Sequence, residues 1–257
     1  MQGISIITGT LNRKEYLHDL IHNTIATDAN VELVLVDGGS TDGSIEYIKS
    51  ITHPRLKLVE VGKRSSYPHY MNLGIRHASH DFVCQWNDDV LLCNGWRDVL
   101  NEIDDEHDAY LFNWKEGSAQ DMENENWLRC NHMRDNGWII CNNADHQYPQ
   151  MVGEKRGEVV MNYGIYKKDV FRRYGMYNQQ YQYYCADGEM SMRAYYSGVK
   201  FKTCTNIKVC VLPAEKRAIM INEDLRLYSQ HCLLYTLPEE MSNKSIKEVF
   251  GDGEYLE

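Results

Sequence analysis

The sequence lacks any apolar run approaching the roughly 20 residues that a membrane-spanning helix needs. No basic leader or cleavage site precedes the apolar residues near its start. None of its eight cysteines is paired in a CxxC spacing, which argues against a zinc or redox motif. We therefore expect a cytoplasmic chain without an integral membrane segment, whose cysteines are reduced thiols, mostly in the core.

An excess of positive charge is absent as well. Lysine and arginine number 27 against 37 aspartates and glutamates, so the formal net charge is −10. A nucleic-acid binder, or a protein that docks on an anionic membrane, would present a basic surface. We therefore expect no nucleic-acid partner. The 43% apolar and 25% charged content is ordinary for a globular protein, and 257 residues are enough for a substantial core.

Neither glycine-rich phosphate-binding fingerprint occurs in the chain. The dinucleotide pattern GxGxxG is missing after the first apolar run, and so is the P-loop pattern GxxxxGK[ST]. A nucleotide site in this chain would therefore have to use carboxylates and a metal ion instead of a glycine cradle.

The first ninety residues alternate between two kinds of pattern. Short apolar runs predict strands at 4–8, 31–36, 56–61 and the first half of 81–90. Apolar residues at helical spacing lie between each pair of runs. Such alternation predicts an α/β fold with a parallel, doubly wound sheet and right-handed crossovers.

Polar residues follow three of these predicted strands, namely Thr8, Asp37 and the pair Asp88-Asp89. Ligands of such sheets bind beyond the carboxyl ends of the strands. A carboxylate pair at the end of a buried strand costs free energy unless a cation meets it, and a divalent ion with oxygen ligands is the usual partner. A simple turn is the alternative, because Asn and Asp favour turns. Three polar clusters at one edge favour a functional site.

The second half predicts strands at 110–114, 138–141, 159–165 and 199–212, with helices at 167–174 and 222–234 and a weak one after 237. Asp187 stands just before another predicted helix, either as its N-cap or as a group that projects into a site. No repeat, low-complexity tract or proline-rich linker divides the chain. We expect one domain over 1–257, with a nucleotide-sugar half (1–108), an acceptor half (109–215) and a helical extension (216–257).

Five segments in order resemble the inverting glycosyltransferases of the large family 2, which have the GT-A fold. The opening strand and loop 4–13 is the first. The others are VDGGSTDGS (36–44), YMNLGI (70–75), Asn87-Asp88-Asp89 in place of the DxD motif, and NYGIYKKDVF (162–171) followed by ADGEMSMR (186–193). The resemblance covers roughly residues 3 to 212. It implies a Rossmann-like, mostly parallel central sheet with helices on both faces.

The resemblance also implies roles for single residues. Those expected to contact the nucleotide-sugar are Thr8, Thr10 and Arg13 in the nucleotide pocket, Asp37 on the nucleobase, His69 and Asn72 on the donor, and Asp88 on the ribose or sugar. Asp89 is expected to bind Mn²⁺ or Mg²⁺, and Asp187 looks like the catalytic base. These roles require Asp89 and Asp187 to converge on one cleft, on opposite sides of the anomeric carbon.

The implied function is metal-dependent, inverting transfer of a sugar from a nucleotide-sugar to a hydroxyl of a glycan or other acceptor. A UDP-sugar is the favoured donor, with GDP- and dTDP-sugars as alternatives; the oligomeric state stays open.

The sequence departs from the family at Asn87, His69 and Ala186, and His231 is only a weak candidate for a histidine that some relatives carry. A catalytically silent binding module of the same fold is therefore the alternative. A nucleotidyltransferase is disfavoured because its glycine- and basic-rich loop is absent.

Overall fold

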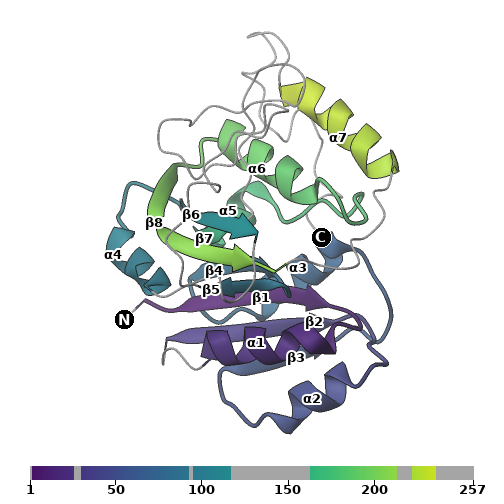
Figure 1. Cartoon of the computed structure of the whole chain (residues 1–257). Coiled ribbons are helices and arrows are strands. Elements are labelled where there is room, and N and C mark those ends of the chain that lie inside the picture. Colours follow the sequence, from purple (N-terminus) through teal and green to yellow (C-terminus); the bar gives the residue numbers. More distant parts are fainter. Residues whose placement is uncertain (1, 26–29, 93–94, 117–162, 213–221, 236–257) are drawn as a thin grey trace.

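The computed structural model describes residues 2–25, 30–92, 95–116, 163–212 and 222–235 (Figure 1). The strand predicted at 138–141, most of the one predicted at 159–165, and the helix predicted after Leu237 lie outside these ranges. Among the described residues, no helix combines the length and the apolar character that crossing a bilayer requires.

The first half of the chain forms the parallel part of the sheet. Its strands are β1 (Ile4–Thr10), β2 (Val31–Asp37), β3 (Leu56–Glu60) and β4 (Phe82–Asn87). They lie in the order β3-β2-β1-β4, and every neighbouring pair is parallel. The helices between them are α1 (Lys14–Ile25), α2 (Ser44–Ser50) and α3 (Tyr67–His77). This part confirms the predicted β-α-β alternation.

The later strands extend the same sheet with mixed directions. β7 (Gly164–Lys167) is antiparallel to β4, and β6 (Ala109–Glu116) is antiparallel to β7. β8 (Phe201–Val211) runs parallel to β6, and the short edge strand β5 (Val90–Leu92) runs antiparallel to β8. The full order is β3-β2-β1-β4-β7-β6-β8-β5. The predicted α/β, mostly parallel sheet is therefore confirmed; its division into domains stays a prediction.

The connection between β4 and β5 consists of Asp88 and Asp89 alone. These two residues form a turn, after which the chain leaves β4 and pairs with β8 at the far end of the strand order. The backbone N–H of Leu212, just past β8, donates to the carbonyl of Asp89 at 2.7 Å. The turn interpretation of this stretch is thus right for the backbone, and the two carboxylates project from that turn.

Helices cover both faces of the sheet, as predicted. On one face α1, α2, the 3-10 turn η1 (Trp96–Asp98) and α4 (Val99–Glu102) pack on side chains such as Ile6 of β1. On the other face α3, α5 (Lys168–Tyr174), α6 (Ala186–Tyr196) and α7 (Asn222–Tyr235) belong to the cluster that contains Ile7. Successive strand residues point to opposite faces, so the continuous apolar runs of β1 and β2 supply both clusters.

The helix ends explain how the candidate residues are placed. Ser66 caps α3 by accepting the N–H of His69, and Pro68 lies in the first turn, where its missing N–H has no cost. α6 begins at Ala186, so Asp187 lies inside its first turn instead of at the cap. α6 and α7 pack against each other at the top of the view (Figure 1).

Candidate active site

The carboxyl ends of β1, β2 and β4 meet at one edge of the sheet. In the strand register, Thr10 pairs with Asp37 and Gly9 pairs with Asn87. The structure therefore brings Asp37 and the Asp88-Asp89 turn to the same edge, as the strand pattern predicted. The residue of β1 at this edge is Thr10, whereas the predicted Thr8 lies two residues before the end of the strand. This edge is where ligands of open α/β sheets bind.

The two carboxylates of the turn share one cationic partner, Arg13. Its Nη2 lies 3.3 Å from Oδ1 of Asp88 and 3.1 Å from Oδ2 of Asp89. Its guanidinium carbon also lies 4.0 Å from the centre of the Tyr16 ring. The sequence predicted a cation beside this pair, with a simple turn as the alternative, but no pattern indicated that the chain itself supplies the cation.

Asp88 is the more buried of the two acids. Its Oδ2 accepts a hydrogen bond from the Thr10 hydroxyl at 2.9 Å. Burial raises the pKa of Asp88 to about 7; the charge of Arg13 lowers this pKa and that of Asp89 raises it. A carboxyl whose pKa is raised to near 7 in this way is typical of functional sites, where burial and neighbouring like charges shift pKa values.

Asp37 is fully buried, and its carboxylate accepts hydrogen bonds from the loop that follows β2. Oδ1 accepts the N–H groups of Gly39 and Ser40 at 2.8 Å each, and Oδ2 accepts the Ser40 hydroxyl at 2.6 Å. Gly39 has φ +89°, and a side chain there would meet the backbone of Gly62. The tight turn therefore depends on this glycine. Asp37 shapes the edge; its contact with a nucleobase stays a prediction.

A second set of bonds joins the loop after β1 to the loop after β2. The N–H of Asn12 donates to the Ser40 hydroxyl at 2.9 Å, and the side-chain oxygen of Asn12 accepts the N–H of Thr41 at 2.7 Å. Asn12 has φ +53°, a left-handed conformation that Asn tolerates better than most residues. These contacts fix the loop that carries Arg13.

Thr8 and Asn72 are buried, whereas His69 is partly exposed to solvent. Thr8 is fully buried within β1, and the ring of His69 is partly exposed in the first turn of α3. Asn72 is buried and makes reciprocal 2.9 Å bonds with the backbone N–H and carbonyl of Tyr177. Asn72 therefore ties α3 to the segment before α6. The donor contacts expected of all three residues stay predictions.

Asp187 is partly exposed, and Oδ1 accepts the N–H of Gly188 at 2.9 Å. Burial in its surroundings raises the pKa of Asp187, and the N–H of Gly188 lowers it, with a net rise. A carboxyl with a raised pKa is a better proton acceptor than an ordinary aspartate.

Buried and partly buried side chains lie between the surroundings of Asp187 and the carboxylate strand β4. Burial raises the pKa of Tyr67 well above its usual value, and the nearby Tyr177 and Asp187 raise it further. The Tyr67 hydroxyl accepts a hydrogen bond from the side-chain amide of Gln85 in β4, and the Gln85 oxygen accepts one from Tyr166 at 2.9 Å. Gln85 therefore links Tyr67 of α3 to Tyr166 of β7 by hydrogen bonds, and Asp187 lies close enough to Tyr67 for its charge to raise the pKa of that tyrosine. No pattern in the sequence pointed to Tyr67 or Gln85.

The donor set of the turn suits a hard divalent ion. The Asp88-Asp89 pair already binds a cation, Arg13, and Mg²⁺ commonly uses one or two carboxylates together with phosphate oxygens. Within the described ranges no group of three or more His, Cys, Asp or Glu residues gathers around a common point. An ion at this turn would therefore draw further ligands from substrate or water, and Arg13, which contacts one oxygen of each carboxylate, would compete with it.

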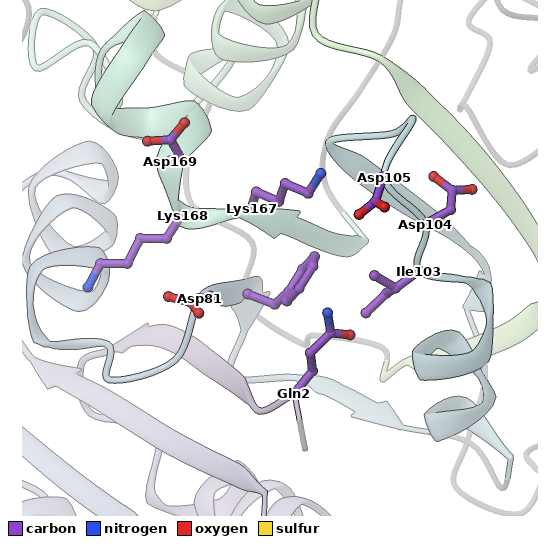
Figure 2. A pocket seen from close by; sticks show the side chains of 9 residues that line it. Gln2, Asp81, Ile103, Asp104, Asp105, Lys167, Lys168 and Asp169 are labelled. Carbon is purple, nitrogen blue, oxygen red and sulfur yellow. The ribbon is translucent and has the colours of Figure 1, made fainter.

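A pocket of about 550 Å³ lies at the opposite edge of the sheet (Figure 2). Gln2 and Asp81, which precede β1 and β4, line it together with Asp104 and Lys167. The carboxylate of Asp104 already forms a hydrogen bond with His107 and an ion pair with Lys202. Because this pocket lies at the amino ends of the parallel strands, it is not the edge that carries Asp88 and Asp89.

The sheet order, the helices on both faces and the carboxylate turn after β4 together define the GT-A class of glycosyltransferase folds. Among solved structures, the chain is similar to the mannosyltransferase PcManGT from Pyrobaculum calidifontis in complex with GDP-Man and Mn²⁺. The TM-score is 0.57, with 20% identity over 82% of this chain and 57% of that one. S. aureus TarS residues 1–349 in complex with UDP-GlcNAc gives a TM-score of 0.64, with 16% identity over 97% of this chain and 72% of that one.

Sequence comparison narrows the class to a family. The profile of glycosyl transferase family 2 matches residues 5–175, and the chain belongs to this family. An uncharacterized glycosyltransferase of Haemophilus influenzae is 33% identical over 97 residues, which are 37% of this chain and 39% of that protein. The chain thus spans well under two thirds of the H. influenzae protein and of the mannosyltransferase.

Proposed function

We propose that the chain transfers a sugar from a nucleoside-diphosphate sugar to a hydroxyl of a glycan or other acceptor, with inversion at the anomeric carbon. The observation that carries this proposal is the Asp88-Asp89 turn, whose two carboxylates hold a cation at the carboxyl edge of the sheet. Membership of family 2 and the nucleotide-sugar complexes of PcManGT and TarS support it.

The residues of the edge would divide the work between binding and chemistry. Asp89, with Asp88 beside it, would hold a Mn²⁺ or Mg²⁺ ion, which supplies charge neutralisation for a leaving diphosphate. Arg13, once released from the carboxylates, would remain beside the same phosphates as a second positive charge. Thr10 fixes the rotamer of Asp88 through its 2.9 Å hydrogen bond. Much of the rate gain in such a reaction comes from positioning.

Asp187 would act as the general base. Inversion in one step requires the acceptor hydroxyl to lose its proton as its oxygen attacks the anomeric carbon, and the bond to the diphosphate oxygen breaks at the same time. The raised pKa of Asp187 makes this carboxylate a better proton acceptor than an ordinary aspartate. Its position at the amino end of α6 leaves it partly exposed to an incoming hydroxyl.

The nucleotide can be identified by a thermal-shift screen with UDP, GDP, CDP and dTDP, each with and without Mn²⁺. We expect one nucleotide, UDP first, to raise the Tm in a Mn²⁺-dependent way, because a ligand that binds only the folded state stabilises it. Asp81→Asn, which changes a carboxylate before β4 at the opposite edge of the sheet, should give the same shifts as the wild type. A protein whose Tm responds to none of the four nucleotides would contradict the proposal.

One observation favours the alternative, a catalytically silent binding module. Arg13 already pairs with both carboxylates, and the family's acid positions at 87 and 186 carry Asn and Ala. Ala186 is fully buried, so its side chain has no access to a ligand. Slow hydrolysis of the donor sugar in the presence of Mn²⁺ separates the two functions, because only an enzyme cleaves the bond to the diphosphate.

A further inference from the structure

The C-terminal helix α7 is attached to the segment that precedes Asp187. Asp224, in the first turn of α7, is 1% exposed. Its Oδ1 accepts the N–H of Gln182 at 2.8 Å, and its Oδ2 accepts the N–H groups of Tyr183 and Tyr184 at 2.9 Å each. Three successive backbone donors therefore converge on one buried carboxylate, an arrangement that binds an anion tightly.

The same segment is held from other sides as well. The N–H of Tyr67 donates to the carbonyl of Gln182 at 2.7 Å, and Nε of Arg64 donates to the Tyr183 hydroxyl at 2.8 Å. The Tyr181 hydroxyl lies 2.7 Å from Nδ1 of His231 in α7. Residues 181–184 are thus clamped between α3 and α7.

The end of the clamped segment sets the start of α6. Cys185 has φ +64°, a left-handed conformation that is uncommon for a residue with a side chain. Its carbonyl accepts the N–H of Glu189 at 2.9 Å, which closes the first turn of α6 around Asp187. A conformation of this kind persists only where the surrounding contacts over-determine it. The bonds to Asp224 lie immediately before it in the chain.

We propose that Asp224 is a positioning residue for Asp187: it holds residues 182–184, and through them the first turn of α6, in the place where the Asp187 carboxylate meets the acceptor hydroxyl. This inference rests on the proposed transferase function. It assigns to α7, which lies beyond the 5–175 span of the family match, a part in the chemistry of the site.

The test compares Asp224→Asn and Asp224→Glu with Glu223→Gln, an exposed control on the same helix turn. Asp224→Asn replaces one accepting oxygen by an NH2 group that cannot accept, so the N–H groups that face it lose their partner. Asp224→Glu keeps the charge and the acceptors but moves them by one methylene. The measurements are kcat, the nucleotide Kd, the pH profile of kcat, and hydrogen exchange of the 182–184 amides.

We expect both Asp224 variants to lower kcat by roughly a hundredfold, the cost of a displacement of about 1 Å at a reacting group. The nucleotide Kd should stay within about twofold of the wild type. The 182–184 amides should exchange faster, and the acid limb of kcat should move to lower pH, because water reaching Asp187 removes part of its burial. A purely structural role would lower the Tm without moving that limb.

The possible failures are distinguishable. A wild type that transfers sugar from no nucleotide-sugar donor overturns the proposed function and this inference with it. A wild type that is active, while folded Asp224→Glu matches Glu223→Gln in kcat and in the acid limb, overturns the positioning role alone. If Asp224→Asn does not fold, the comparison of Asp224→Glu with the control still decides.

Discussion

Nη2 of Arg13 lies 3.1 Å from Oδ2 of Asp89, so an arginine of the chain itself is in contact with the carboxylate predicted to bind the metal. The same nitrogen lies 3.3 Å from Asp88. Guanidinium and divalent ion would compete for the same oxygens. The pairing has a physical reason, because two buried carboxylates left without a cation would repel each other and lose their hydration.

Replacing Arg13 should therefore expose the ion-binding capacity of the turn. We expect Arg13→Gln to bind Mn²⁺ at least about tenfold more tightly than the wild type in the absence of nucleotide, equivalent to 1.4 kcal/mol. Arg13→Lys, which keeps the charge, should stay near the wild type. Titration calorimetry with Mn²⁺ measures both. Equal Mn²⁺ affinity in all three proteins would show that Arg13 does not compete with an ion at this turn.

Removing Asp89 tests the same turn from the other side. We expect Asp89→Ala to abolish the gain in nucleotide affinity that Mn²⁺ produces, because one of the two hard oxygen ligands is lost. The comparison is the nucleotide Kd with and without Mn²⁺, in this variant and in the control Asp81→Ala. If the gain from Mn²⁺ persists in Asp89→Ala, the ion is bound elsewhere.

Asp187→Asn should separate binding from chemistry. The amide keeps the shape but accepts no proton, so transfer should fall by roughly 10²–10⁴-fold while nucleotide affinity stays unchanged. Because burial raises the pKa of Asp187, the wild-type kcat should fall as the pH drops through a value above the ordinary 3.9 or so of an aspartate. Near-normal turnover of the variant would remove Asp187 as the base.

The strands and their shared edge could be predicted because they depend on local patterns. Apolar runs with short helical segments between them leave few topologies, and the ends of parallel strands must meet at one edge. The common edge of Asp37 and the Asp88-Asp89 turn follows from that pattern, whereas the pairing of Thr10 with Asp37 came only from the structure. The resemblance to the family rested on the order of five short motifs, each of which is weak by itself.

The partners of the site residues could not be predicted in the same way. Arg13 reaches the carboxylates across 76 positions of the chain, and Asp224 reaches Tyr183 across 41. Such pairs depend on how loops are placed on the finished sheet, which no local pattern encodes. Asn72 is a related case. The family resemblance implied a contact with the sugar donor, whereas the structure shows hydrogen bonds from its side chain to the backbone of Tyr177.

Asn72 offers a test of that structural role. Asn72→Ala removes the partners of both the N–H and the carbonyl of Tyr177, so we expect the free energy of unfolding to fall by about 2 kcal/mol. His69→Ala, three residues earlier and partly exposed, should change it by less than about 0.5 kcal/mol. Chemical denaturation measures both variants. Equal stability of the two would show that the Tyr177 pairing contributes little.

His231 should make stability depend on pH. Burial lowers the pKa of His231, the charge of Glu189 raises it and that of Arg193 lowers it, with a net fall. Above pH 6.5 both the folded and the unfolded states hold a neutral imidazole, so His231 adds no pH dependence there. As the pH falls from 6.5 through the lower folded-state pKa, the unfolded chain takes up the proton first, and stability is lost over that window.

His231→Gln, whose amide can still bond to Tyr181, should lose less stability than the wild type between pH 7 and pH 5 when unfolding is followed by denaturant titration. Parallel losses in the two proteins across this range would mean that His231 does not titrate in the folded state as its burial requires.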